Sequence, residues 1–251
     1  MSGIVSLHHP GTVLFVHAHP DDETISTGAL IAELIARGST VVLVTASRGE
    51  RGEVVPGPLS ALVGTEELAH ERERELDRAT TTLGVAQRFW LGESPARAAG
   101  LESRNYRDSG MRWVRPGLAG PADDIDDDAL VAAPLDEVVG DLSHLIDLLQ
   151  PSLVVSYDDG GGYGHPDHVR MHDATLAACA ALGVPFAEVV PEPIVDAEWF
   201  DLGSRLGVVT DALRHYASQL TVDGTDIVHS GGQREPITTS VGLRLHENRS
   251  A

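Results

Sequence analysis

The chain contains no lysine, one cysteine and no long apolar run. All 18 of its basic residues are arginines, and the 38 acidic residues give a formal net charge of −20. An acidic surface repels phosphate backbones and anionic lipid headgroups, which argues against binding to nucleic acid or to a membrane surface. The single Cys179 cannot close an internal disulfide, which excludes a secreted disulfide scaffold. No transmembrane or signal segment is evident, so we expect a cytoplasmic protein.

Apolar strands alternate with amphipathic helices along most of the 251 residues. Strands are expected at 12–16, 40–45, 88–91 and 152–157, and helices at 24–37, 65–83, 134–150 and 168–182. Such alternation builds parallel sheets, so we expect an α/β fold: a doubly wound, mostly parallel sheet with helices on both faces. No linker or repeat divides the chain, and one domain over 1–251 is expected. Periodicity disappears between about 92 and 128, where we expect a loop over the functional site.

Two polar segments directly follow predicted strands. His17-Ala-His-Pro-Asp-Asp-Glu23 follows the first strand, and Gly160-Gly-Gly-Tyr-Gly-His-Pro-Asp-His168 follows the fourth. Ligands of open parallel sheets bind beyond the carboxyl ends of the strands, so these segments face one crevice if the two strands are neighbours. Two histidines and one carboxylate around an open fourth position are the ligands of hydrolytic zinc sites.

This ligand set predicts one metal ion per chain. The expected ligands are His19, Asp22 and His168. Asp21 remains free as the general base, while His165 and Tyr163 are candidates to donate hydrogen bonds to a developing oxyanion. Zn²⁺ is the expected cofactor because it lowers the pKa of its bound water to about 7, although Fe²⁺ accepts the same donors. His17 and Asp167 are expected to orient the ligands.

Each segment also has a purely structural interpretation. Asp21, Asp22 and Glu23 could act only as helix caps and dipole partners, which contribute about 0.5–2 kcal/mol. The glycine run could be a tight turn, with His165 and His168 as solvated surface groups. Capping requires neither the preceding histidines nor a second His-Pro-Asp at another strand end, so we favour the metal site. The chain lacks the Gly-x-Ser-x-Gly of serine hydrolases, and its first strand–helix turn lacks a dinucleotide-binding glycine pattern.

Together, His19-Pro-Asp-Asp-Glu23 and His165-Pro-Asp-His168 resemble the signature of the PIG-L / LmbE-like zinc de-N-acetylases. Both motifs match without substitution, and the surrounding pattern fits over roughly residues 10 to 183. The resemblance implies a Rossmann-like fold and hydrolysis of an N-acetyl group from an amino sugar, commonly N-acetylglucosamine (GlcNAc) linked to inositol or another aglycone. It places metal ligands, base and electrostatic helper on the same residues as the argument above.

Further motifs resemble the mycothiol-biosynthesis branch of this family, which deacetylates GlcNAc-inositol. They are Gly49-Glu-Arg-Gly-Glu53, Arg107-Asp-Ser-Gly-Met111 and His215-Tyr-Ala-Ser-Gln219. The resemblance implies that Arg72 and Asp108 hold the polyol, with Glu53 as a further residue of the pocket. Neighbouring glutamates also allow Arg72 to form only surface ion pairs, and Glu53 could belong to a solvated loop.

The sequence departs from this branch after Gly183: residues 185–200 show no clear family pattern, and the part from about 184 is divergent. The leading hypothesis is a zinc-dependent N-deacetylase acting on a small N-acetylated sugar, with GlcNAc-inositol as one candidate. An amidase of mycothiol-type conjugates and a deacetylase of a natural product are the alternatives. A non-catalytic metal- or sugar-binding module is a third hypothesis. The sequence predicts no particular oligomeric state.

Overall fold

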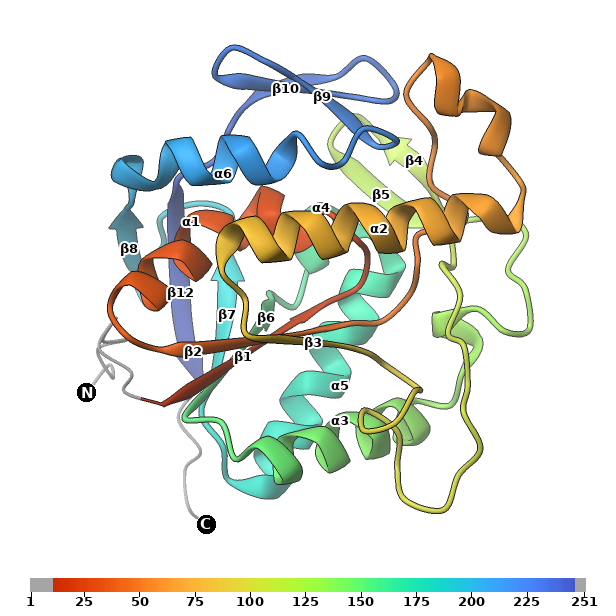
Figure 1. Ribbon diagram of the computed structural model, residues 1–251. Coiled ribbons are helices and arrows are strands. Elements are labelled where there is room, and N and C mark those ends of the chain that lie inside the picture. Colours follow the sequence, from red (N-terminus) through yellow and green to blue (C-terminus); the bar gives the residue numbers. More distant parts are fainter. Residues whose placement is uncertain (1–10, 247–251) are drawn as a thin grey trace.

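A seven-stranded sheet forms the centre of the molecule in a computed structural model that describes residues 11–246 (Figure 1). The strand order is β3-β2-β1-β6-β7-β12-β8. The strands are β1 (Thr12–His17), β2 (Thr40–Thr45), β3 (Gln87–Trp90), β6 (Leu153–Tyr157), β7 (Phe186–Val190), β8 (Glu198–Asp201) and β12 (Ser240–His246). The first five in the order run parallel, while β12 is antiparallel to both of its neighbours. The predicted doubly wound, mostly parallel fold is confirmed.

Helices cover both faces of this sheet (Figure 1). One layer holds α1 (Asp22–Ala36), α2 (Glu66–Leu83) and α6 (Leu206–Leu213), and the other holds α3 (Leu135–Leu149) and α5 (Pro166–Leu182). Side chains of a strand point alternately to its two faces. Val13 and Phe15 therefore join the core beneath α1 and α6, whereas Leu14 and Val16 join the core beneath α3 and α5. A strand buried on both faces needs an unbroken apolar run, which is why β1 was predictable.

Smaller elements surround the sheet. They are η1 (Pro58–Leu62), β4 (Met111–Arg115), β5 (Leu118–Pro121), η2 (Leu130–Ala132), α4 (Gly161–Gly164), η3 (Gly203–Arg205), β9 (Leu220–Asp223), β10 (Asp226–His229) and β11 (Arg234–Pro236). Within residues 11–246, none of the helices has the length and apolar character needed to cross a membrane.

The expected loop between 92 and 128 contains a β-hairpin, formed by β4 and β5. The prediction of an irregular segment was wrong at this point. The reason is that β4 is largely exposed and its register with β5 shifts between Trp113 and Arg115, so no apolar alternation marks it. The last predicted helix also begins two residues early, at Pro166, because His165 caps it by accepting the Asp167 N–H at 3.2 Å.

A buried carboxylate on β7 links this strand to α5 and to β12. Glu188 of β7 is 1% exposed and accepts a hydrogen bond from His172 of α5 at 2.9 Å and another from Arg244 of β12. Burial lowers the pKa of His172, but its hydrogen bonds to Glu188 and Asp173 outweigh burial and raise that pKa above 6.5. Burial raises the pKa of Glu188, but His172 and Arg244 outweigh it and hold that pKa below 4.5.

Replacing Glu188 should destabilise the fold in a pH-dependent way. Glu188→Gln should lower the free energy of unfolding by up to about 3–5 kcal/mol, because it leaves the buried His172 and the half-buried Arg244 without their carboxylate. A raised His172 pKa stabilises the fold fully below pH 6.5 and loses its effect as pH rises through the folded value. A lowered Glu188 pKa stabilises fully above pH 4.5 and loses its effect as pH falls through the folded value.

The difference between wild type and Glu188→Gln should therefore be largest between pH 4.5 and 6.5 and smaller at about pH 8.5. Urea denaturation within that pH range and at about pH 8.5 measures this difference in the free energy of unfolding. Asp211→Asn is the control, because Asp211 forms an exposed pair with Arg214 that contributes less than about 1 kcal/mol. A loss that does not depend on pH would contradict the charged His172–Glu188 pair.

Candidate metal centre

The two polar motifs meet at one edge of the central sheet. β1 and β6 pair directly and in parallel, with Val13 opposite Leu153, so the segments that follow them emerge side by side. The strand order reverses between these two strands, which is the switch point at which α/β sheets bind ligands. The condition on which the sequence prediction depended is met.

Three possible metal-ligand atoms form an equilateral triangle at this edge. His19 Nδ1, Asp22 Oδ2 and His168 Nε2 lie 3.3 Å from one another in all three pairs. In a tetrahedral site with metal–ligand distances of 2.0–2.1 Å, the ligand atoms lie about 3.3–3.4 Å apart. The triangle therefore fits three corners of a four-coordinate metal site, and its donor types suit zinc.

Both imidazoles are oriented by partners on their other nitrogen. His19 Nε2 lies 3.1 Å from Asp167 Oδ2, and His168 Nδ1 lies 3.2 Å from the Gly161 carbonyl oxygen. In the neutral imidazoles, a proton on each of these nitrogens leaves a lone pair on the nitrogen that belongs to the triangle. Burial lowers the pKa of His19, but Asp108 and Asp167 outweigh it and raise that pKa well above 6.5. The expected orienting role of Asp167 has this contact as its support.

His165 lies beside the triangle as a neutral hydrogen-bond donor. Its Nδ1 accepts the Asp167 N–H, so its proton is carried by Nε2. Burial, and then the neighbouring imidazoles of His19 and His168, lower the pKa of His165 to about 2. Ligand atoms of His165, His19 and His168 all lie within 4.8 Å of one another, as do those of His19, Asp108 and Asp167. The ring centroids of His165 and His19 are 4.6 Å apart.

Tyr157, which the sequence analysis missed, supports two corners of the triangle. Its hydroxyl donates to Asp22 Oδ2 at 2.7 Å and accepts the Ala18 N–H at 2.7 Å. Its ring stacks on His168, with the centroids 4.1 Å apart and the planes 9° from parallel. His17, expected to orient a ligand, instead packs edge-on against the Tyr157 ring at 5.3 Å. No feature of the sequence marks this tyrosine, because only the pairing of β6 with β1 brings its hydroxyl to Asp22.

Asp21 has a backbone conformation that is rare outside glycine. Its φ of 104° costs of order 1–3 kcal/mol and persists only where the surroundings impose it. Its carbonyl accepts the N–H groups of Thr24 and Ile25 at 3.0 and 2.9 Å, but its side chain makes no capping hydrogen bond, contrary to the structural interpretation. Burial, and then the charges of Asp22 and Glu23, raise the pKa of the Asp21 carboxyl well above 3.8.

Tyr163 lies over the triangle, at the edge of the hairpin β4–β5. Its ring centroid is 5.2 Å from that of His168 and 5.8 Å from that of Trp113 on β4. Gly164 has a φ of +89°, and a Cβ there would lie 2.9 Å from the Ala119 carbonyl oxygen of β5. Glycine thus lets the hairpin approach the motif closely. The segment between 92 and 128 borders the site, although its form differs from the one predicted.

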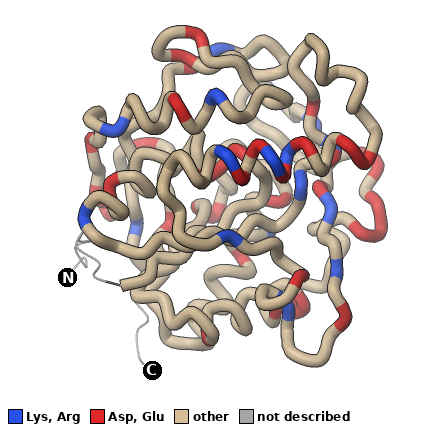
Figure 2. Tube along the Cα trace, viewed as in Figure 1, with Lys and Arg blue, Asp and Glu red and all other residues tan. Residues whose placement is uncertain are grey.

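Arg72 is buried, although acidic and basic residues alternate along this part of α2 (Figure 2). Glu71 pairs with Arg74 at 2.6 Å, but the Arg72 guanidinium donates to the backbone carbonyls of Gly49, Gly52 and Glu53. The alternative of surface ion pairs was therefore wrong for Arg72. Its guanidinium holds the loop over residues 49–53 in place, and its contact with substrate stays a prediction.

Asp108 lies beside His19, whereas Glu53 is exposed. The buried Asp108 has its Oδ1 3.6 Å from His19 Nε2, and its two oxygens accept the N–H groups of Gly110 and Arg51 at 2.8 and 3.2 Å. The side chain of Glu53 is exposed and accepts the Ser230 hydroxyl at 3.2 Å. Substrate contacts by Asp108 and Glu53 stay predictions.

Residues 14–179 match the family model described as "PIG-L: GlcNAc-PI de-N-acetylase". The chain belongs to the PIG-L family. A relative from Kineococcus radiotolerans, named 1D-myo-inositol 2-acetamido-2-deoxy-alpha-D-glucopyranoside deacetylase, is 44% identical over 178 residues, which are 71% of this chain and 47% of the relative. The chain spans about half the length of the curated relatives it matches.

Solved structures of deacetylases share the fold of this PIG-L chain. The A40926 pseudoaglycone deacetylase superposes with a TM-score of 0.61 at 21% identity, covering 97% of this chain and all of that one. The N,N'-diacetylchitobiose deacetylase from Pyrococcus horikoshii gives 0.59 at 22% identity, covering 85% of this chain and 74% of that one. At these identities the likeness supports the fold.

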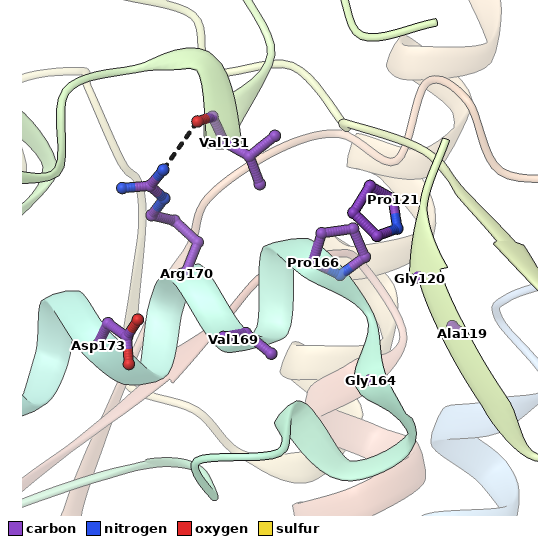
Figure 3. A pocket seen from close by; sticks show the side chains of 9 residues that line it. All are labelled: Ala119, Gly120, Pro121, Val131, Gly164, Pro166, Val169, Arg170 and Asp173. Carbon is purple, nitrogen blue, oxygen red and sulfur yellow. Dashed lines mark hydrogen bonds between the residues drawn. The ribbon is translucent and has the colours of Figure 1, made fainter. Parts of the chain in front are cut away.

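A separate cavity of about 430 Å³ lies between the hairpin and α5 (Figure 3). It is lined by Ala119, Gly120, Pro121, Val131, Gly164, Pro166, Val169, Arg170 and Asp173. Arg170 is fixed at its border by donating to the Val131 carbonyl at 2.7 Å (Figure 3). No predicted metal, base or substrate residue lines this cavity, so it is distinct from the candidate metal centre.

Removing the Arg72 guanidinium should loosen the loop over residues 49–53. Arg72→Met keeps the aliphatic chain but leaves the buried Gly49 carbonyl unpaired, at a cost of about 1–3 kcal/mol, and removes the part-buried bonds to Gly52 and Glu53. Hydrogen exchange at residues 49–53 should therefore accelerate, and the free energy of unfolding should fall. Arg74→Met, an exposed control on the same helix, should change the free energy of unfolding by less than about 0.5 kcal/mol. Unchanged exchange in Arg72→Met would refute the loop-holding role and favour direct substrate contact.

Proposed function

We propose that this chain is a metal-dependent N-deacetylase that hydrolyses the acetamide of a GlcNAc-type amino sugar, with GlcNAc-inositol as the candidate substrate. The observation that carries this proposal is the 3.3 Å triangle of His19, Asp22 and His168, with Asp21 beside it in the chain. Membership of the PIG-L family supports the reaction class. The names of relatives at 41–44% identity support the substrate.

The triangle residues would hold one metal ion per chain, with Zn²⁺ as the expected ion and Fe²⁺ as the alternative. When bound, such an ion lowers the pKa of a coordinated water to about 7 and polarises the substrate carbonyl. Asp167 and the Gly161 carbonyl hold His19 and His168 in the required tautomers, and Tyr157 holds Asp22. The chain therefore contributes a donor set that is already oriented.

Asp21 acts as the general base in this proposal. It accepts a proton from the attacking water and passes a proton to the sugar nitrogen as the C–N bond breaks, which yields acetate and a free amine. Its half-buried carboxylate lies within electrostatic reach of His19 and Arg72. Its unusual φ sets it apart from the helical residues that follow it.

His165 and Tyr163 serve as donors to the acyl oxygen. The neutral His165 carries its proton on Nε2, so it can donate a hydrogen bond where negative charge develops. Tyr163 is 40% exposed above the triangle, at the side from which substrate enters, and is the second donor. Asp108 is the polyol acceptor of the proposal, since a carboxylate has lone pairs beyond those used by the backbone N–H groups.

Acetate release tests the reaction and the metal together. The protein should release acetate from GlcNAc-inositol faster than from free GlcNAc; a chelator should abolish the release, and added Zn²⁺ should restore it. His168→Ala should lose both bound metal and activity, whereas His70→Ala, exposed on α2, should lose neither. Metal analysis and an acetate assay measure the two. Chelator-insensitive release would contradict the metal site, and no release from metal-loaded protein would contradict the substrate.

Asp21→Asn tests the base separately from the metal. Turnover should fall about 10²–10⁴-fold, the usual loss when a general base is removed. Bound metal should be unchanged, because Asp21 is outside the triangle and asparagine tolerates a positive φ. Asp77→Asn, an exposed control on α2, should keep wild-type turnover. Turnover of Asp21→Asn within a few-fold of wild type would show that another group removes the proton.

A further inference from the structure

Glu23 is a buried carboxylate that the proposed reaction does not use. It lies on the first turn of α1, two residues after Asp21, and its exposed fraction is 0%. A carboxylate removed from water is costly unless hydrogen bonds replace its hydration, so its partners indicate its role.

The two oxygens of Glu23 face different partners. Oε2 accepts the backbone N–H of Asp21 at 3.1 Å. Oε1 accepts the hydroxyls of Thr24 and Tyr216. Tyr216 is 193 residues away in the chain, so a tertiary contact determines how the Glu23 carboxylate is turned.

The hydrogen bond that Glu23 accepts holds the peptide group between Pro20 and Asp21 in place. The N–H of a residue just before a helix has no partner within the helix and needs one elsewhere. The Asp21 carbonyl is already held by the N–H groups of Thr24 and Ile25. Glu23 therefore holds the N–H side of Asp21. Together with the hydrogen bonds to the Asp21 carbonyl, it keeps the residue at a φ of 104°.

Tyr216 is itself rigidly placed. It is fully buried in the core beneath α6, and its carbonyl accepts the N–H groups of Gln219 and Leu220 at 2.9 and 3.0 Å. Two residues later, Ser218 donates its backbone N–H and its hydroxyl to the buried Glu75 of α2, both at 2.6 Å. The Tyr216 hydroxyl thus projects from a turn that is anchored on two sides.

We propose that Glu23 and Tyr216 are positioning residues for the base: the Tyr216 hydroxyl orients the Glu23 carboxylate, which holds the Asp21 backbone and thereby places the Asp21 carboxylate. This inference rests on the proposed role of Asp21 as the general base. Neither residue touches substrate in this proposal. Losing either should impair the chemical step without weakening substrate binding.

Tyr216→Phe removes only the hydroxyl, and Tyr106→Phe is its matched control. Tyr106 is also fully buried and donates to a buried carboxylate, Asp141, at 2.8 Å, but that partner lies on α3. Tyr216→Phe should lower kcat about 10- to 100-fold, with KM within about two-fold and bound metal unchanged. Tyr106→Phe should keep kcat within about two-fold of wild type while being similarly destabilised.

Glu23 variants separate positioning from packing. Glu23→Gln retains an oxygen that can accept the Asp21 N–H and an amide that can donate to the Tyr216 hydroxyl, so it should keep most of kcat. Glu23→Leu fills the same space without an acceptor and should lose kcat as Tyr216→Phe does. Equal losses of kcat in Glu23→Gln and Glu23→Leu would overturn the proposal.

Amide hydrogen exchange at Asp21 gives a readout that does not depend on catalysis. Exchange at this N–H should accelerate in Tyr216→Phe and Glu23→Leu and stay at the wild-type rate in Tyr106→Phe. If Tyr216→Phe matches Tyr106→Phe in both kcat and Asp21 exchange, the positioning role is refuted. Failure of the proposed function has a different signature: an active Asp21→Asn variant, or no acetate release from metal-loaded protein.

Discussion

The parallel pairing of β1 with β6 is the interaction on which the site depends. Val13 to Phe15 lie opposite Leu153 to Val155, and this register brings together motifs separated by about 145 residues. α1 and α5 cover opposite faces of the sheet, and their N-termini both follow strands at this edge (Figure 1). Helix N-termini favour negative charge, so both helices stabilise a carboxylate such as Asp22 there. A shift of one residue in this register would separate the triangle atoms.

Four aspartates lie at the site with few cations around them. Asp108 and Asp167 are buried and Asp21 and Asp22 are half-buried, and Arg72 is a buried arginine whose charge reaches Asp21 and Asp108. Buried carboxylates are stable only with partners that offset their charge. Backbone N–H groups serve Asp108, and His19 and Ser109 serve Asp167. The remaining negative charge beside the triangle is what a divalent cation would neutralise, and this agrees with the donor geometry.

The sequence was most informative where function depends on local pattern. Apolar runs located β1 and β6, and the motifs after them contained the triangle atoms. Tyr157 could not be found this way, because a tyrosine is ordinary in a strand and only sheet pairing brings its hydroxyl to Asp22. The burial of Arg72 was detectable, since it shares the helical stripe of Leu68, Leu76 and Ala79, the face of α2 that packs inward. Its glutamate neighbours hid this stripe.

The part of the chain after Gly183 extends the central sheet and contacts the first turn of α1. It adds β7, β12 and β8 to the sheet and carries Tyr216, whose hydroxyl donates to Glu23. The hairpin β4–β5, with Trp113 against Tyr163, borders the exposed side. If the proposed positioning holds, sequence changes after Gly183 act on how firmly Asp21 is held, whereas changes in the hairpin act on what can approach it. Divergence of the C-terminal part is compatible with an unchanged substrate, because the residues that would meet the sugar come from other elements.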